Sequence, residues 1–259
     1  MRMPFQINSN GKDLLGIVHI ANKQLDIPVI IIMCYGLNGN RCEQHRMSVK
    51  LGEMCEKHAI NVVRFDYSDV GISEGDFFSS KLSDRIQNVI DIYNFIKGCF
   101  DNRLSVFLVG FSDGAKIAIK SKQYISDFKG LICWNPIIRV PIDANAKNNV
   151  SKIKLKLHKK YKKPYKQLFG VCLNMDIINE LDRDNSIDVL DDNFDKLFVF
   201  GERDGFTYHI RQYIEGHLFQ KLQIIIISDS GHLFGSTLWE KQVIECSVKW
   251  IKGVIVNLK

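Results

Sequence analysis

The chain has 259 residues, of which 46% are hydrophobic and 25% are charged. This size and composition allow one substantial buried core, in one α/β domain or two small ones. The formal net charge of +6 is too small an excess to indicate a nucleic-acid-binding protein. No apolar run approaches the roughly 18 residues that a membrane helix needs, so we expect no membrane-spanning helix.

The N-terminal ten residues turn polar too soon to form a secretory signal. Seven cysteines are scattered along the chain, odd in number and without C-x-x-C spacing. This pattern is typical of reduced thiols in a cytosolic protein rather than of a disulfide framework or a zinc site. We therefore expect a cytoplasmic protein with mostly buried thiols and no metal site.

Short apolar runs alternate with helical patterns through most of the chain. This alternation predicts an α/β fold with a mostly parallel central sheet of about eight strands and helices on both faces. The expected strands cover residues 14–20, 29–33, 61–65, 105–109, 130–134, 196–200 and 222–227. The expected helices cover residues 43–58, 83–100, 115–122 and 237–258.

The alternation stops between residues 136 and 195, where Lys, Asn and Asp become frequent. Within this stretch, residues 152–157 alternate lysine with apolar residues, which predicts a small half-buried strand. A stretch of about sixty irregular residues inside a compact domain is usually a lid or a binding loop. We therefore expect residues 1–135 and 196–259 to form the core, and residues 136–195 to form an inserted cap.

A G-x-S-x-G pattern occupies residues 110–114, between an expected strand and an expected helix. A serine held between two glycines on such a turn adopts a strained backbone conformation that exposes its hydroxyl. The pattern alone recurs by chance, so its position between a strand and a helix is the stronger signal. Ser112 is therefore the candidate nucleophile.

A serine hydroxyl attacks well only when a base accepts its proton and a third group orients that base. Asp204 follows the expected strand at 196–200, and His232 follows the expected strand at 222–227. The carboxyl ends of parallel strands meet at one edge of a sheet, where ligands bind. We therefore expect Ser112, Asp204 and His232 to meet there as the catalytic residues.

Other residues compete for two of these roles. Glu202 and Asp229 are alternatives to Asp204, but Glu202 lies nearer the strand and Asp229 is too close to His232 in sequence to reach its ring easily. Among the other histidines, His217 also follows a glycine, but it precedes a strand. A lone histidine after a strand is often a surface or capping residue, so that alternative stays open.

An oxyanion needs two N–H donors placed in advance, each worth roughly 2.7–4 kcal/mol of the barrier. The amide of Asp113, directly after the nucleophile, is one candidate. The amide of Leu37 is the other, because Gly36 lets the turn after the strand at 29–33 fold tightly. An ordinary strand-to-helix turn is the alternative, and the absence of G-x-G-x-x-G gives a dinucleotide-binding fold no support.

The chain resembles the α/β-hydrolase superfamily, and more narrowly the bacterial cinnamoyl and feruloyl esterase-like hydrolases, which are grouped with serine aminopeptidase-like hydrolases. Residues 35–41, Tyr-Gly-Leu-Asn-Gly-Asn-Arg, are similar to that family's oxyanion turn, usually His-Gly-Phe-Thr, a small residue and Asn-Arg. Residues 64–75, from Arg-Phe-Asp-Tyr to Ser-Glu-Gly, are similar to its Arg-Phe-Asp-Phe…Gly…Ser-Asp-Gly signature. The Ser112 turn and the Asp204 and His232 loops complete the likeness.

The resemblance implies an α/β-hydrolase fold. It also implies an enzyme that cleaves an ester or thioester of a small or medium acyl or aryl group through an acyl-enzyme. Ser112 would be the nucleophile, His232 the general acid and base, and Asp204 the orienting acid, with no metal or organic cofactor. Tyr35 replaces the family's usual histidine, and Asp113 its usual glutamine. An acidic side chain at 113 would disfavour anionic substrates or raise the basicity of His232, unless it points outward.

The expected cap contains apolar residues that either line an acyl or aryl pocket or pack the cap onto the core. They are Leu155, Leu157, Tyr161, Tyr165, Leu168, Phe169, Leu173 and Met175. Its lysines form either a solvated face or a docking surface for an acidic acyl carrier protein, which would indicate a thioesterase. They are Lys159, Lys160, Lys162, Lys163 and Lys166. A non-catalytic binding module is a further hypothesis, which the complete Ser-His-Asp set disfavours.

Overall fold

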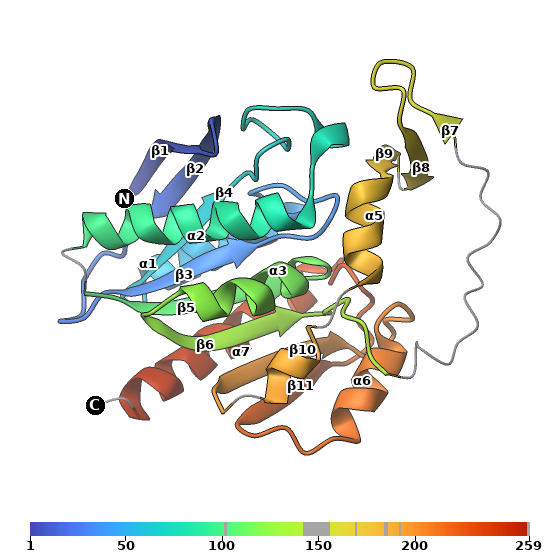
Figure 1. Ribbon diagram of the computed structural model, residues 1–259. Helices are drawn as coiled ribbons and strands as arrows, with labels where there is room; N and C mark the ends of the chain where they lie inside the picture. The colour runs from blue at the N-terminus through green and yellow to red at the C-terminus, as the bar shows by residue number, and fades with distance from the viewer. Residues whose placement is uncertain (101–102, 142–155, 169, 184–185, 192, 258–259) are drawn as a thin grey trace.

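The structure is a computed structural model that describes residues 1–100, 103–141, 156–168, 170–183, 186–191 and 193–257. Its centre is an eight-stranded sheet (Figure 1). The strands are β1 (Arg2–Ser9), β2 (Lys12–His19), β3 (Val29–Cys34), β4 (Ile60–Phe65), β5 (Ser105–Phe111), β6 (Phe128–Trp134), β10 (Asp195–Gly201) and β11 (Leu222–Ile227). Their order is β1-β2-β4-β3-β5-β6-β10-β11, and every pair from β4 to β11 is parallel. The predicted mostly parallel sheet is confirmed.

Helices cover both faces of this sheet. They are α1 (Met47–Glu56), α2 (Leu82–Cys99), α3 (Gly114–Ser121), α6 (Tyr208–Glu215) and α7 (Thr237–Asn257), with short 3-10 helices at Gln44–Arg46, Phe77–Ser79, Lys122–Tyr124 and Asp188–Asp191. α1 and α7 lie on one face, and α2 and α3 lie on the other (Figure 1). Ile30 and Ile32 belong to the core beneath α2 and α3, whereas Ile31 belongs to the opposite core. The continuous apolar run of β3 is therefore buried on both faces.

Between β6 and β10 the chain forms a second, smaller sheet and a helix. These elements are β7 (Lys156–Leu157), β8 (Pro164–Leu168), β9 (Val171–Asn174) and α5 (Met175–Asp182). The three strands pair antiparallel in the order β7-β8-β9. Asn174 starts α5, because its side-chain oxygen accepts a hydrogen bond from the Ile177 amide at 2.9 Å.

The predicted half-buried strand at 152–157 is only partly described. Residues 152–155 lie outside the described residues, and Lys156 and Leu157, which form β7, are both exposed. The prediction of a half-buried strand is therefore wrong for Lys156 and Leu157. A two-residue strand pairs with β8 through its backbone, so it needs no buried side chain.

The start of the first helix also differs from the prediction. The sequence predicts a helix from residue 43, but α1 begins at Met47. Glu43, His45 and Arg46 have φ values of 56°, 53° and 61°, which a right-handed helix does not allow. Apolar periodicity does not reveal these left-handed residues.

All seven cysteines are free thiols. Cys34, Cys55 and Cys133 are buried, and Cys99 is exposed, so fewer thiols are buried than expected. In the described part of the chain, no helix combines the length and apolar character needed to cross a membrane.

Candidate active site

The turn between β5 and α3 holds Ser112 with φ 54°. A Cβ atom on Gly110 would lie 2.5 Å from Ala115 Cα, and one on Gly114 would lie 2.2 Å from Cys34 O. Real Cβ atoms do not approach other atoms so closely, so both positions require glycine. The G-x-S-x-G pattern is therefore explained by close packing of this turn against β3 and α3.

Three side chains from three strand ends form one hydrogen-bonded line. His232 Nε2 lies 2.9 Å from Ser112 Oγ, and His232 Nδ1 lies 2.7 Å from Asp204 Oδ2. An ionised carboxylate only accepts hydrogen bonds, so Nδ1 carries the proton and Nε2 accepts from the serine hydroxyl. The structure thus brings together the three residues that the sequence predicts as catalytic.

The carboxyl of Asp204 is held by further donors. Its Oδ2 accepts from Thr207 Oγ1 at 2.6 Å, and its Oδ1 accepts from the Phe206 amide at 2.9 Å. Burial alone raises the pKa of Asp204, but the hydrogen bonds from His232, Thr207 and Phe206 outweigh it and hold the pKa below its usual range. Asp204 is therefore ionised at neutral pH.

The alternatives to Asp204 and His232 lie elsewhere. Glu202 accepts a hydrogen bond from the Asp229 amide at 2.9 Å, and the Asp229 carboxylate pairs with Arg203. Both carboxylates thus have partners other than the imidazole. His217 stacks on Tyr213 near the end of α6, with ring centroids 3.8 Å apart.

Asn135 is a buried residue of the site that the sequence prediction lacks. Its Nδ2 donates to the His232 carbonyl at 2.8 Å, and its Oδ1 accepts from the Gly201 amide at 2.7 Å. Just before it, the Trp134 carbonyl accepts from the Ser112 amide at 2.9 Å. The end of β6 thus fixes the nucleophile turn and the histidine loop relative to β10. The available signal was a polar residue directly after an apolar strand.

The two candidate oxyanion donors lie on turns that meet at the nucleophile. The Gly39 amide donates to the Gly36 carbonyl at 3.0 Å, which closes the turn that contains Leu37. A Cβ atom on Gly36 would lie 3.2 Å from Ser112 Cβ, so this turn passes directly beside the serine. Among the described residues, neither the Leu37 amide nor the Asp113 amide has a hydrogen-bond acceptor.

The side chain of Asp113 has a partner of its own. Its Oδ1 lies 3.1 Å from Nζ of the buried Lys116. The carboxylate is therefore directed along α3 and paired with a cation, which weakens its effect on His232 and on an anionic substrate. This ion pair was not among the arrangements expected for Asp113 from the sequence.

The segment that is similar to the family signature supports the turn that contains Leu37. Asp66 Oδ1 accepts from the Arg41 amide at 2.7 Å, and Oδ2 pairs with the Arg41 guanidinium and accepts from the Ile72 amide at 3.0 Å. Tyr35, at the start of the turn, is fully buried, and its hydroxyl accepts from the Tyr67 amide at 2.6 Å. Residues 64–75 thus act on the site through backbone position.

Glu43 is a buried acid beside the same turn. Its Oε1 accepts from the Gly36 amide at 3.2 Å. Burial raises the pKa of Glu43 to about 8, because hydrogen bonds from the Gly36 and Gln44 amides offset the desolvation only in part. The residue is therefore mostly protonated at neutral pH, and its ionisation in the folded protein is costly.

Glu43→Gln is expected to change how stability depends on pH. Between pH 4.5 and about 8, the unfolded chain releases the Glu43 proton while the folded protein keeps it, so rising pH lowers the free energy of unfolding. Glutamine cannot ionise, so the variant does not lose this free energy. The free energy of unfolding of the variant minus that of the native protein should therefore be about 3–5 kcal/mol larger above this window than at acid pH. Urea unfolding across this range measures the difference, with Glu53→Gln, at a side chain 42% exposed, as control. A constant difference across the range contradicts the prediction.

Several apolar residues of segment 136–195 pack onto the core. Leu173 and Ile177 form a small buried cluster against which Leu37 packs. Tyr161 stacks on Phe78 with ring centroids 4.9 Å apart, whereas Leu157 is exposed. The expected pocket residues Leu155 and Phe169, and the side chain of Leu168, lie outside the described residues.

The sheet order and the strand-to-helix serine turn define the α/β-hydrolase fold, which comparisons with solved structures also show. No protein-family model matches the sequence, and no curated protein matches it either. The chain is similar to Est1E from Butyrivibrio proteoclasticus, solved with ferulic acid bound, at 18% identity and TM-score 0.77, covering 96% of this chain and 99% of that chain. It is similar to the α/β hydrolase GrgF from Penicillium sp. sh18 at 14% identity and TM-score 0.74, covering 99% of each. It is also similar to the esterase domain of a Rhodothermus marinus protein at 12% identity and TM-score 0.71, covering 96% of this chain and 97% of that chain. At these identities the likeness shows the fold alone.

Proposed function

We propose that the protein is a serine hydrolase that cleaves a carboxylic ester of a small or medium acyl or aryl group through an acyl-enzyme. The observation that supports this most strongly is the hydrogen-bonded line from Ser112 through His232 to Asp204. The ferulic acid bound to the structurally similar Est1E supports an aryl ester among the substrates. The free thiols fit a reducing compartment, so we place the enzyme in the cytoplasm.

In the proposed reaction, Ser112 Oγ attacks the ester carbonyl carbon while His232 Nε2 accepts the hydroxyl proton. The negative charge on the carbonyl oxygen is stabilised by the amides of Leu37 and Asp113. The imidazolium, stabilised by the Asp204 carboxylate, gives its proton to the departing alcohol oxygen. Water then attacks the acyl-enzyme by the same steps, and the acid leaves as Ser112 regains its proton.

Segment 136–195 is proposed as a cap over this site. The contact of Leu37 with the cluster around Leu173 and Ile177 places part of the segment against the turn that would bind the oxyanion. A side chain packed there limits what can approach the serine. The segment would therefore contribute to substrate choice.

The test is a panel of p-nitrophenyl esters of graded chain length, aryl esters, acyl thioesters and aminoacyl amides. We expect turnover of esters, and covalent labelling of Ser112 by a fluorophosphonate probe, located by mass spectrometry of the labelled peptide. The Ser112→Ala protein is the blank for both measurements. Absence of both turnover and labelling contradicts the proposal and favours a binding module on the same fold.

The second candidate function is a thioesterase that acts on an acyl group attached to an acidic carrier protein. The observation that favours it is a set of exposed lysines on the turn between β7 and β8. Lys160 pairs with Asp76 at 3.3 Å and Lys163 with Asp176 at 3.9 Å, whereas Lys159 and Lys162 have no carboxylate partner among the described residues. Such a surface attracts an acidic protein at low salt.

Neutralising the four lysines tests this second function. Changing Lys159, Lys160, Lys162 and Lys163 to glutamine is expected to lower kcat/KM for a carrier-bound acyl thioester at least about tenfold at low salt, because charge steering speeds association. Turnover of a small neutral ester should not change. The exposed Lys23 and Lys57, changed to glutamine, are the control. Equal turnover of the carrier substrate by the two variants contradicts the carrier-protein function.

A further inference from the structure

The two edges of the central sheet differ in their protection. β1, at one edge, carries Arg2 and Pro4, and both residue types discourage the addition of another strand. β11, at the other edge, reads Leu-Gln-Ile-Ile-Ile-Ile and contains neither a charge nor a proline. Ile226 on β11 is 43% exposed. An apolar, unprotected edge is what a pairing strand recognises.

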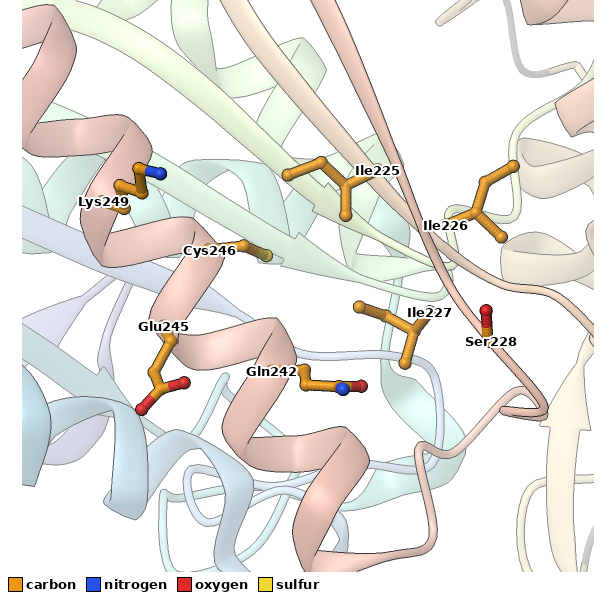
Figure 2. A pocket seen from close by; sticks show the side chains of 8 residues that line it. All are labelled: Ile225, Ile226, Ile227, Ser228, Gln242, Glu245, Cys246 and Lys249. Atoms are coloured by element: carbon orange, nitrogen blue, oxygen red, sulfur yellow. The ribbon is translucent and has the colours of Figure 1, made fainter.

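A groove runs along this edge between β11 and α7. Ile226 and Gln242 line one end and Lys221 and Val254 the other, while Ile225 and Cys246 are among the residues that line both halves. Figure 2 shows Ile225 and Ile227 on the side of β11 that faces Gln242 and Cys246, with Ile226 on the other side of the strand. The groove therefore follows the full strand, with its centre near Ile225 and Cys246.

We propose that a second copy of this chain occupies this edge, so that β11 pairs antiparallel with the partner's β11 about a two-fold axis at Ile225. The pairing would satisfy the backbone N–H and C=O groups along the outer side of β11. It would also cover the apolar surface of Ile226. The two eight-stranded sheets would then be continuous across the dimer.

The charges at this edge are self-complementary about that axis. Pairing centred on Ile225 would bring Lys221 of one copy towards Asp229 of the other, because the two residues flank the ends of β11 and are equally far from its centre in sequence. Their side chains are 50% and 61% exposed, and within one chain Lys221 lies 3.9 Å from Asp195 while Asp229 pairs with Arg203. A two-fold interface brings the same patch of both copies together, so each contact occurs twice and opposite charges meet each time.

The same symmetry applies to α7. Glu245 and Lys249 line the groove on either side of its central part. Two antiparallel α7 helices related by the axis would place Glu245 of each copy near Lys249 of the other. In the described part of the chain Lys249 has no carboxylate partner, and Glu245 has Lys241 at 3.7 Å. A second copy therefore fits the groove better than an acidic or basic peptide, which would place a like charge against either Glu245 or Lys249.

The first measurement is the mass in solution by light scattering over a dilution series. We expect twice the 29.8 kDa of one chain. Ile226→Lys should give a monomer, because each copy would place an ammonium group in the paired, apolar edge. The control is Met3→Lys, which changes an exposed apolar residue on the opposite edge strand and should leave the dimer intact.

A charge exchange tests the register. Lys249→Glu should raise the dimer dissociation constant at least about tenfold, because it places like charges together across the axis. Adding Glu245→Lys to the same chain should restore the native dissociation constant. Circular dichroism verifies that each variant is folded, and none of these readouts depends on the proposed activity. A monomeric native protein, a dimer that persists in Ile226→Lys, or an exchange that restores nothing overturns the proposal.

Discussion

Replacing Ser112 with alanine is expected to lower kcat for the best ester by about six orders of magnitude. The oxygen that attacks the carbonyl and the proton that His232 Nε2 accepts, 2.9 Å away, are both removed. The amides of Leu37 and Asp113 remain, so a residual rate of about 10³–10⁴ over water is expected from oxyanion stabilisation and binding. Steady-state kinetics with p-nitrophenyl esters measures the loss.

The substitution should leave the fold intact. Ser112 is held by a backbone hydrogen bond to the Trp134 carbonyl at 2.9 Å, which alanine also forms, and both residue types bear the same strain at positive φ. Ser121 is a matched control, because it is buried at the end of α3, the helix that follows Ser112, and its hydroxyl has no partner among the described residues. Ser121→Ala should keep full activity. A Ser112→Ala protein that keeps more than about a tenth of the native kcat would show that the nucleophile is another group.

The site was predictable because parallel strands place their carboxyl ends at one edge of a sheet. Ser112, Asp204 and His232 each follow a buried or half-buried strand, so the order of apolar runs fixed which loops meet. Asn135 follows the same rule after β6. It escapes prediction because an amide is neither nucleophile nor base and so fills no place in a catalytic pattern, and its hydrogen bonds to the His232 carbonyl and the Gly201 amide appear only in three dimensions.

The first strand was missed for a different reason. β1 pairs with β2 through a turn in which Asn10 and Gly11 have φ values of 50° and 80°, and Asn-Gly is the strongest short signal for such a hairpin. The alternation along β1 is weak, because Arg2, Met3 and Pro4 are all exposed. Apolar periodicity alone therefore overlooks an edge strand that buries few side chains.

The secondary structure of segment 136–195 could not be predicted from the pattern of apolar residues. Its described elements are short: β8 and β9 have 5 and 4 residues, and α5 has 8. β8 and β9 are too short to produce a clear period, and the apolar residues of α5 (Ile177, Ile178 and Leu181) recur over only about two helical turns. The position of α5 is set by tertiary hydrogen bonds, because Asn174 donates to the Ser80 carbonyl and Glu180 accepts from the Leu82 amide. Such contacts join residues that are far apart in sequence.

Replacing Asp204 with asparagine is expected to lower kcat by about four orders of magnitude while leaving the fold unchanged. The carboxylate accepts from His232 Nδ1 at 2.7 Å and from Thr207 Oγ1 at 2.6 Å. An amide facing the ring as a donor favours the tautomer protonated on Nε2. That nitrogen then cannot accept the proton of Ser112. Single-turnover acylation by a p-nitrophenyl ester measures the lost step directly.

The same variant has a signature in stability. The hydrogen bonds hold the folded pKa of Asp204 below 3.8, its usual value, so the carboxylate stabilises the folded protein above pH 3.8 and this contribution is lost as pH falls through the lower, folded pKa. Asp204→Asn should therefore destabilise the protein near neutral pH and approach native stability in acid. Unfolding by urea at several pH values tests the sign. A difference that grows in acid would contradict the assigned hydrogen bonds to the Asp204 carboxylate.

The neighbouring acids provide the matched controls for this assignment. Glu202→Gln and Asp229→Asn alter carboxylates in the same pair of loops, but these bond to the Asp229 amide and to Arg203 rather than to the imidazole. Each should therefore lower kcat by less than about tenfold, the small effect expected of a group that does not orient the base. A larger loss from either change than from Asp204→Asn would move the orienting role to that residue, because only the acid that contacts His232 during proton transfer controls its tautomer.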